Sequence, residues 1–209
     1  MREALKRRHL EPHDAVVLAL TRGGVPVGVE VAKALQCPWE PLVVRKVGAP
    51  HQSELAVGAV ADADPPVTEL DMGTMALCGV DASWVRSQAE LELHEIRRRR
   101  QLFMGTRPVC SLAGKTAVVV DDGLATGTTM RAAIHAVRTR QPAQVVVAVP
   151  VAPHSVVEGL RTLVDGVVCL RTPELFEAVG LHYVRFPQVQ DEEVCAALKI
   201  ATAPSEALS

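Results

Sequence analysis

The sequence predicts an α/β protein with a doubly wound, mainly parallel sheet flanked by helices. Short Val-rich runs alternate with segments of helical pattern along most of the 209 residues, which is typical of this fold class. Hydrophobic residues make up 48 % of the chain and aromatic residues only 3 %, so Val, Leu and Ala must build the core. That composition favours a helix-covered sheet over a β-sandwich. We expect one domain over residues 1–209, because neither a repeat nor a low-complexity linker divides it.

The bulk properties exclude several classes of protein. A formal net charge of −2 gives no global argument for binding nucleic acid or an anionic membrane. The 5 cysteines are scattered and contain no Cys-x-x-Cys pair, so they indicate reduced thiols and not a disulfide frame or a zinc site. No apolar run approaches the length of a membrane-spanning helix. We therefore expect a cytoplasmic protein without a membrane partner.

The first predicted strand, residues 15–20, leads into a possible anion site. It ends in Thr21-Arg22-Gly23-Gly24, and a helix follows to about residue 36, with Pro26 in its first turn. Paired glycines at a strand-to-helix junction let backbone N–H groups approach an anion, and Arg22 adds a permanent positive charge. The alternative is a tight turn with a surface arginine.

Residues 38–44 form the second predicted strand, which enters a polar segment at residues 45–54. Its glycine and proline predict a mobile loop, and Arg45 and Lys46 are the residues in it most suited to meet a phosphate. Alternatively, the two form an exposed basic pair at a strand end. A strand at residues 55–61 and an acidic, proline-containing turn at residues 62–71 follow.

Residues 81–104 predict a long helix that Asp81 can cap. Arg97 to Arg100 lie near its C-terminal end, where positive charge suits the helix dipole, and a solvated face is the default interpretation. Nucleic-acid binding and a subunit contact are the alternatives, although no interleaved aromatic residues support RNA recognition.

The most informative stretch is residues 118–129. Val118 to Val120 indicate a buried strand, which ends in Asp121 and Asp122, and Thr126 to Thr129 then offer N–H groups and hydroxyls at the start of a helix. Carboxylates beside a phosphate cradle suggest a ligand with both hydroxyls and phosphate, such as a sugar phosphate. The alternative is ordinary connection chemistry in a strand–turn–helix unit.

The alternation continues to about residue 170. It predicts strands at 115–120, 144–151 and 166–170 and helices at 127–140 and 153–163. Residues 171–186 differ, because they hold the single tyrosine and two of the three phenylalanines. Such a concentration indicates either a plug for the core edge or a platform for a planar ligand, with Phe176 and Tyr183 as candidates for stacking.

Residues 117–129 resemble the 5-phosphoribosyl-1-pyrophosphate (PRPP) motif of type I phosphoribosyltransferases. That motif has four apolar residues, two acids, two mostly apolar residues, one variable residue and Thr-Gly-x-Thr. The one departure is Gly123, where the family usually has an apolar side chain. The resemblance implies the type I fold with a small hood, to which the termini, including about residues 171–190, would contribute.

The resemblance also implies roles for the candidate residues. Asp121 and Asp122 would hold the ribose hydroxyls, directly or through Mg²⁺ carried in with PRPP. The loop Ala125, Thr126, Gly127, Thr128 and Thr129 would bind the 5-phosphate. Thr21, Arg22, Gly23 and Gly24 would bind the pyrophosphate, and Lys46 or Arg45 would complete the clamp. The implied catalytic residues are Asp121, Asp122, Arg22 and Lys46.

The resemblance does not identify the acceptor. Hypoxanthine-guanine enzymes have an aspartate where this chain has Ala125, Leu124 to Gly127 match adenine enzymes, and Thr-Arg-Gly points to uracil-type regulators. Over nearly its whole length the chain is most similar to uncharacterised bacterial phosphoribosyltransferase-like proteins, through residues 22–27, 43–46, 121–127 and 178–180. We expect a Mg²⁺-dependent phosphoribosyltransferase acting on an unidentified base or amine, and a homo-oligomer, in the first place a dimer. The alternative is a PRPP-binding regulator with little turnover that could bind RNA.

Overall fold

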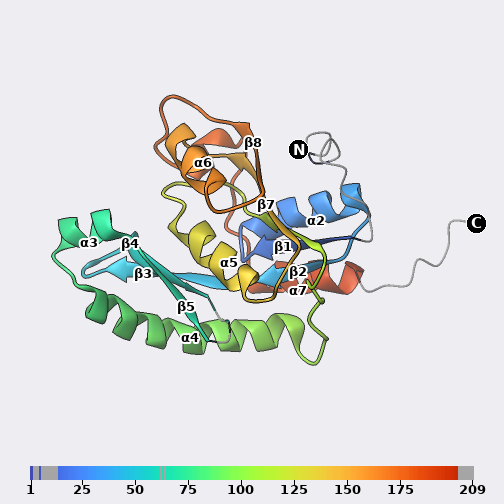
Figure 1. The fold of residues 1–209 in the computed structure, drawn as a ribbon, viewed down its shortest axis with the longest axis horizontal. Coiled ribbons are helices and arrows are strands. Elements are labelled where there is room, and N and C mark those ends of the chain that lie inside the picture. Colours follow the sequence, from blue (N-terminus) through green and yellow to red (C-terminus); the bar gives the residue numbers. More distant parts are fainter. Residues whose placement is uncertain (2–4, 6–13, 62, 64, 202–209) are drawn as a thin grey trace, which may run out of the picture.

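A five-stranded parallel sheet forms the centre of the molecule (Figure 1). The computed structural model describes residues 1, 5, 14–61, 63 and 65–201. The strand order is β2-β1-β6-β7-β8. The strands are β1 (Ala15–Leu20), β2 (Trp39–Leu42), β6 (Thr116–Val120), β7 (Gln144–Val151) and β8 (Gly166–Arg171). Every residue of β1 and β6 is buried, which explains their unbroken apolar sequence and confirms the predicted sheet.

Helices cover both faces of this sheet. On one face, α2 (Gly24–Leu35) packs Val31 and Leu35 against alternate residues of β1 and β6. On the other face, α5 (Thr128–Arg138) and α6 (His154–Arg161) pack over the residues of opposite parity. The side-chain period of two along each strand therefore divides the core into two apolar layers. The predicted helices at 127–140 and 153–163 are confirmed with slightly shorter bounds.

A second, antiparallel sheet of three strands forms the hood. It contains β3 (Val44–Ala49), β4 (Gln52–Ala61) and β5 (Val67–Leu70), in the order β3-β4-β5. The short helix α3 (Met72–Cys78) follows, and the long helix α4 (Ala82–Met104) runs beneath the small sheet (Figure 1). As predicted, Asp81 caps α4, accepting a hydrogen bond from the backbone N of Trp84 at 2.8 Å.

The predicted mobile loop at residues 45–54 is wrong as a secondary-structure assignment, because these residues form the β3–β4 hairpin. Gly48 lies at a register shift in β3, where a Cβ would come within 2.7 Å of the Ser53 backbone. His51 adopts a positive φ of 63° in the turn. The residues that indicated a loop therefore mark a bulge and a tight turn. Similarly, part of the predicted turn at 62–71 is β5; residues 62 and 64 lie outside the described part of the chain.

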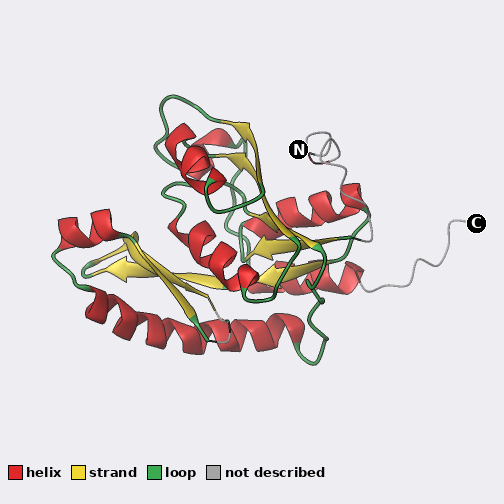
Figure 2. Cartoon of the chain, in the orientation of Figure 1, coloured by secondary structure: helices red, strands yellow, loops and turns green. Residues whose placement is uncertain are grey.

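The C-terminal part returns to the centre of the molecule. After β8, a segment made mostly of loops and turns contains the short 3₁₀ helix η1 (Val179–His182) and leads to α7 (Asp191–Ala201) (Figure 2). Helix α7, which we did not predict, packs against α2 and α4. Within the described residues, no helix combines the length and the apolar character that crossing a bilayer requires.

Candidate active site

A cavity of about 600 Å³ lies at the carboxyl ends of β1 and β6. The register of these strands pairs Ala19 with Val120, so the residues that follow each strand lie side by side. Most of the predicted site residues line this cavity, namely Thr21, Arg22, Gly23, Arg45, Lys46, Asp121, Asp122, Ala125, Thr126, Gly127, Thr128 and Thr129. Three motifs that are far apart in the sequence therefore face one space.

The two carboxylates are held close together on the cavity wall. The backbone N of Asp122 donates a hydrogen bond of 2.9 Å to Oδ1 of Asp121. Desolvation and the neighbouring Asp122 raise the pKa of Asp121 well above its ordinary value. Desolvation also raises the pKa of Asp122, while the charge of Lys46 opposes the shift. A ligand with hydroxyl groups or a bound cation would relieve this concentration of negative charge.

The glycine loop after β1 lies directly against these carboxylates. A Cβ on Gly23 would come within 1.9 Å of Oδ2 of Asp122, and a Cβ on Gly24 within 2.8 Å of the Val120 carbonyl oxygen. Gly24 is thus a packing contact and not part of the cavity wall. The absence of side chains at these positions lets the two motifs approach each other.

The predicted phosphate loop surrounds the N-terminus of α5. Gly127 precedes the helix with a φ of 76°, which favours glycine. The hydroxyls of Thr126 and Thr128 are 2.9 Å apart, and Thr128 also donates a hydrogen bond of 2.9 Å to Oδ2 of Asp71. The hydroxyls, the N-terminal N–H groups and the helix dipole together are suited to an anion.

Arg131 supports this loop, a role that the sequence did not predict. Its guanidinium donates to the Thr126 carbonyl oxygen and to the Thr128 hydroxyl, both at 3.1 Å. It also donates to Glu69 of β5 at 3.0 Å, which ties the loop to the small sheet. An arginine in the first turn of a helix opposes the helix dipole, and this was the available signal of a special role.

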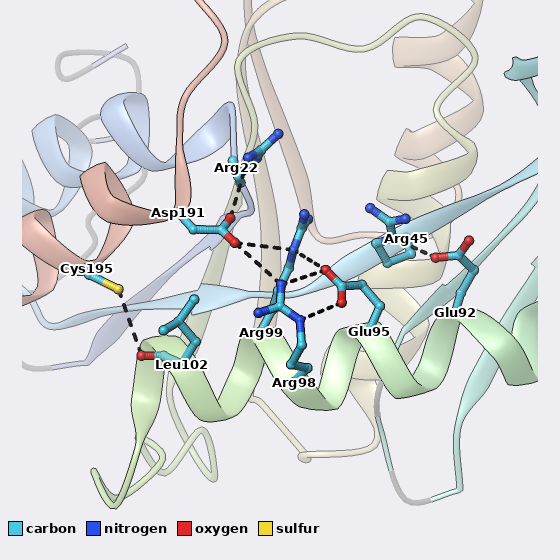
Figure 3. A network of polar contacts seen from close by, with 9 residues as sticks. All are labelled: Arg22, Arg45, Glu92, Glu95, Arg98, Arg99, Leu102, Asp191 and Cys195. Carbon is cyan, nitrogen blue, oxygen red and sulfur yellow. Dashed lines mark hydrogen bonds and ion pairs between the residues drawn. The ribbon is translucent and has the colours of Figure 1, made fainter.

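Arg22 and Arg45, the two arginines predicted to bind phosphate groups, both pair with carboxylates. Nε of Arg45 lies 2.7 Å from Oε2 of Glu92 in α4. Nη1 of Arg22 lies 3.5 Å from Oδ1 of Asp191, at the start of α7 (Figure 3). Within the described residues, no group of three or more His, Cys, Asp and Glu side chains could hold a metal ion.

The four arginines from Arg97 to Arg100 differ in how exposed their side chains are. Arg97, Arg98 and Arg100 are exposed, in agreement with the predicted solvated face. Arg99 differs, because only 15 % of its side chain is exposed and it lines the cavity. Arg97 and Arg100 line a second cavity of about 590 Å³, which holds none of the predicted site residues.

The aromatic segment covers the carboxylate turn. The Tyr183 hydroxyl donates a hydrogen bond of 2.5 Å to the Asp122 carbonyl oxygen, and desolvation raises the pKa of Tyr183 to about 12. Phe176 stacks on His182 with ring centroids 5.1 Å apart. Neither aromatic side chain lines the cavity, whereas Val179 and Phe186 of the same segment do.

The same segment explains the departure at Gly123. A Cβ at this position would come within 2.6 Å of Cγ1 of Val179 and within 3.1 Å of the Val151 carbonyl oxygen. Val179 therefore occupies the space that the apolar side chain expected at this position would need.

Comparisons with known proteins agree with this geometry. The phosphoribosyl transferase domain family matches residues 1–180, so the chain belongs to the phosphoribosyltransferase family. Two Mycobacterium tuberculosis proteins, MT0597 and Rv0571c, are each 45 % identical over 197 residues, which cover 93 % of this chain. Their names carry phosphoribosyl transferase as a provisional assignment. The chain spans only 44 % of the length of these curated relatives.

One solved structure supports the fold independently. The crystal structure of TT1426 from Thermus thermophilus is similar to this chain, with a TM-score of 0.74 and 40 % sequence identity. The similarity covers 94 % of this chain and 91 % of TT1426. The central parallel sheet with its small antiparallel hood is thus a phosphoribosyltransferase fold.

Proposed function

We propose that the protein transfers the phosphoribosyl group of PRPP to a nitrogen nucleophile and releases pyrophosphate. The observation that carries this proposal is the packing of Gly23 against Asp122, with the threonine loop of α5 on the same cavity. Two anion-binding loops on either side of a carboxylate pair match a ligand that has phosphate at both ends and hydroxyls between them. PRPP has this distribution of groups.

The ligand would lie across the ends of β1 and β6. The 5-phosphate would bind to residues 125–129, which line the cavity before and at the N-terminus of α5. The ribose hydroxyls would bind Asp121 and Asp122. The pyrophosphate would meet residues 21–23 together with Arg45 and Lys46, which all line the cavity.

The reaction needs little covalent chemistry from the protein. The bond from C1 to the pyrophosphate oxygen breaks, and its electron pair leaves with the pyrophosphate. The lone pair of the nucleophile forms the new C1–N bond, and a proton on nitrogen is released. Positive charge on the ribose ring would be stabilised by Asp121 and Asp122, and negative charge on the leaving group by Arg22 and Lys46.

Mg²⁺ fits this arrangement as an ion that the substrate carries. Oxygen ligands are available from the Asp121 and Asp122 carboxylates, while the pyrophosphate would supply the others. The ion would neutralise the leaving group. No further protein carboxylate is required for that role.

The acceptor would lie against Val179 and Phe186, two of the apolar residues in the cavity wall. Ala125 offers no group that exchanges a proton with a base, so we assign the acceptor only as a nitrogenous base or amine. The regulator that binds RNA gains no support from Arg98, an exposed arginine that pairs with Glu95 and approaches Asp191.

Pyrophosphate release across a panel of bases and amines tests the proposal. Wild-type protein with Mg²⁺ and PRPP is expected to release pyrophosphate with at least one acceptor. The double variant Asp121→Asn with Asp122→Asn is expected to lose at least about 1,000-fold of that rate, since it removes the charge facing the ribose.

A matched control is Asp165→Asn, a carboxylate remote from the cavity that pairs with Arg138 at 3.0 Å. Its rate is expected to stay within about twofold of wild type. Acceptor-dependent release that survives the double change would overturn the assigned site. Tight PRPP binding without release for any acceptor would instead favour the regulator.

A further inference from the structure

The Asp191 carboxylate lies within ion-pair distance of three arginines, Arg22, Arg98 and Arg99 (Figure 3). Oδ1 of Asp191 lies 3.5 Å from Nη1 of Arg22, and its Oδ2 lies 3.8 Å from Nε of Arg99. Arg22 comes from the loop after β1, whereas Arg99 comes from α4, so the contact joins distant parts of the chain. Both arginines line the cavity together with Lys46.

Positive charge exceeds negative charge in this cluster. Its arginines are Arg22, Arg98 and Arg99, and its acids are Glu95 and Asp191, which leaves one positive charge in excess. Lys46 lines the same cavity, where its charge acts on Asp121 and Asp122. Half-buried cations that outnumber their partners favour an anionic ligand.

Hydrogen bonding at this junction is incomplete. Among the described residues, the buried polar side-chain atoms without a hydrogen-bond partner are Oγ1 of Thr21, Nε of Arg99 and Oδ1 of Asp191. Nε of Arg99 lies 2.9 Å from Oε1 of Glu95, but as an ion pair and without hydrogen-bond geometry. Buried polar groups in folded proteins are normally bonded. Thr21 and Arg99 line the cavity and carry donors, which suits an anionic ligand, whereas Oδ1 of Asp191 is an acceptor outside the cavity wall.

We propose that Arg99 is a second arginine of the pyrophosphate subsite and contacts the leaving group together with Arg22. This inference rests on the proposed transferase function and extends it to α4, where the sequence indicated only a solvated basic run. Arg99 and Arg22 bind the anion from two sides, and Asp191 holds the two guanidiniums at the cavity wall before the ligand arrives. Arginine suits this role because its planar fork pairs with two phosphate oxygens at once.

Arg98 provides a matched comparison. It adjoins Arg99, pairs with the same Glu95 at 2.7 Å and approaches the same Asp191 at 3.7 Å. However, 57 % of its side chain is exposed and it does not line the cavity. A general effect of charge in the cluster would appear in both arginines, whereas contact with pyrophosphate would appear only in Arg99.

Direct binding of two ligands by titration calorimetry separates the possibilities. Pyrophosphate with Mg²⁺ probes the Arg22 side of the cavity, and ribose 5-phosphate probes the loop of α5. Arg99→Gln is expected to weaken pyrophosphate binding by about 10- to 100-fold, which is the loss expected for a charge-assisted contact. Ribose 5-phosphate binding is expected to stay within about twofold, and this result also shows that the variant is folded.

Two further variants complete the test. Arg98→Gln is expected to bind both ligands within about twofold of wild type. Arg99→Lys is expected to bind pyrophosphate with intermediate affinity, since lysine keeps the charge but loses the planar fork.

The outcomes distinguish this inference from the proposed function. If wild-type protein binds both ligands and Arg99→Gln keeps its pyrophosphate affinity, the assignment of Arg99 is overturned and the function stands. An equal loss of both ligands would show a structural role for Arg99 and also overturn the assignment. Wild-type protein that binds neither ligand would overturn the proposed function and this inference with it.

Discussion

The two proposed anion sites at the ends of the cavity are built in different ways. The 5-phosphate site consists of one short stretch, residues 125–129, in which backbone N–H groups and neutral hydroxyls face the cavity. Its one supporting cation, Arg131, lies behind the loop and bonds to its backbone. The pyrophosphate site draws cations from three separate elements, the loop after β1, strand β3 and helix α4.

Their electrostatics differ accordingly. The phosphate loop depends on the helix terminus and on geometry. The charges that bond to it, Arg131 and Asp71, are of opposite sign. On the pyrophosphate side, the arginines are held by the carboxylates of Glu92, Glu95 and Asp191. The difference matches the proposed reaction, in which the 5-phosphate would stay bound to the ribose while the pyrophosphate would leave. A site whose cations have alternative partners within the protein can release a highly charged product.

The largest expected effect tests whether the glycine loop depends on contact with the carboxylates. In Gly23→Ala the new methyl group would collide with Asp122, so pyrophosphate release is expected to fall about 100-fold. Binding of ribose 5-phosphate, measured by calorimetry, is also expected to weaken, because Asp122 would bind the ribose hydroxyls. Gly159→Ala is the control, since a Cβ there meets nothing within 4 Å. A rate close to wild type in Gly23→Ala would break the proposed link between the two motifs.

The next effect tests the opposite end of the cavity. Arg131→Gln removes the guanidinium that bonds to Thr126 and Thr128 and is expected to weaken ribose 5-phosphate binding about 10-fold. Pyrophosphate binding is expected to be unchanged, the reverse of the pattern for Arg99→Gln. Arg138→Gln, an exposed arginine on the same helix, serves as the control. If Arg131→Gln weakened both ligands equally, the two sites would not be independent.

A smaller effect concerns the carboxylates between the two sites. The pKa of Asp121 is raised above its ordinary 3.8. Between pH 3.8 and this raised pKa, the folded state therefore binds more protons than the unfolded state. Stability of the ligand-free protein is therefore expected to fall as the pH rises through that window. Asp121→Asn is expected to flatten this dependence and to stabilise the protein by about 1–2 kcal/mol at about pH 7. Urea unfolding at several pH values checks this, and an unchanged slope would contradict it.

The smallest effect concerns the segment that covers the carboxylate turn. Tyr183→Phe removes the hydrogen bond to the Asp122 carbonyl oxygen and is expected to lower the free energy of unfolding by about 1 kcal/mol. The affinities for pyrophosphate and for ribose 5-phosphate are each expected to change by no more than about twofold. A selective loss of ribose 5-phosphate binding would instead place this contact in the sugar site.

The contrast between the two sites also explains what the sequence could predict. Asp121, Asp122 and the threonine loop lie within a continuous stretch, so local order alone specifies their chemistry. The parallel sheet was similarly predictable, because fully buried strands leave unbroken apolar runs. Arg99, Arg131 and Asp191 could not be found in this way, since charged residues on helices match the pattern of a solvated surface. Their roles depend on the packing of α4, α5 and α7 around the cavity.

Of the small hood sheet, the sequence predicted one strand, residues 55–61, which lies within β4, while β3 and β5 were missed for a different reason. Its strands β3 and β4 carry Gly48 and Pro50 at a bulge and a turn, which are the same residues that indicate a loop. Pairing between two irregular strands is a tertiary property, so local propensity did not reveal it.

The division of the molecule into two sheets has a spectroscopic consequence. The chain contains only 2 tryptophans, Trp39 and Trp84. Trp39 lies in β2 at an edge of the parallel sheet, whereas Trp84 lies in the first turn of α4, whose Val85 is buried with the core residues of the small sheet. Each indole is half-buried, so its emission depends on how its own surroundings exclude water. Both indoles pack against the core cluster that contains Val47, Val57 and Val85, and Trp39 also packs against the cluster formed by α2 and β1. Fluorescence of variants that keep a single tryptophan would therefore report on two ends of one shared core, the edge of the parallel sheet and the start of α4.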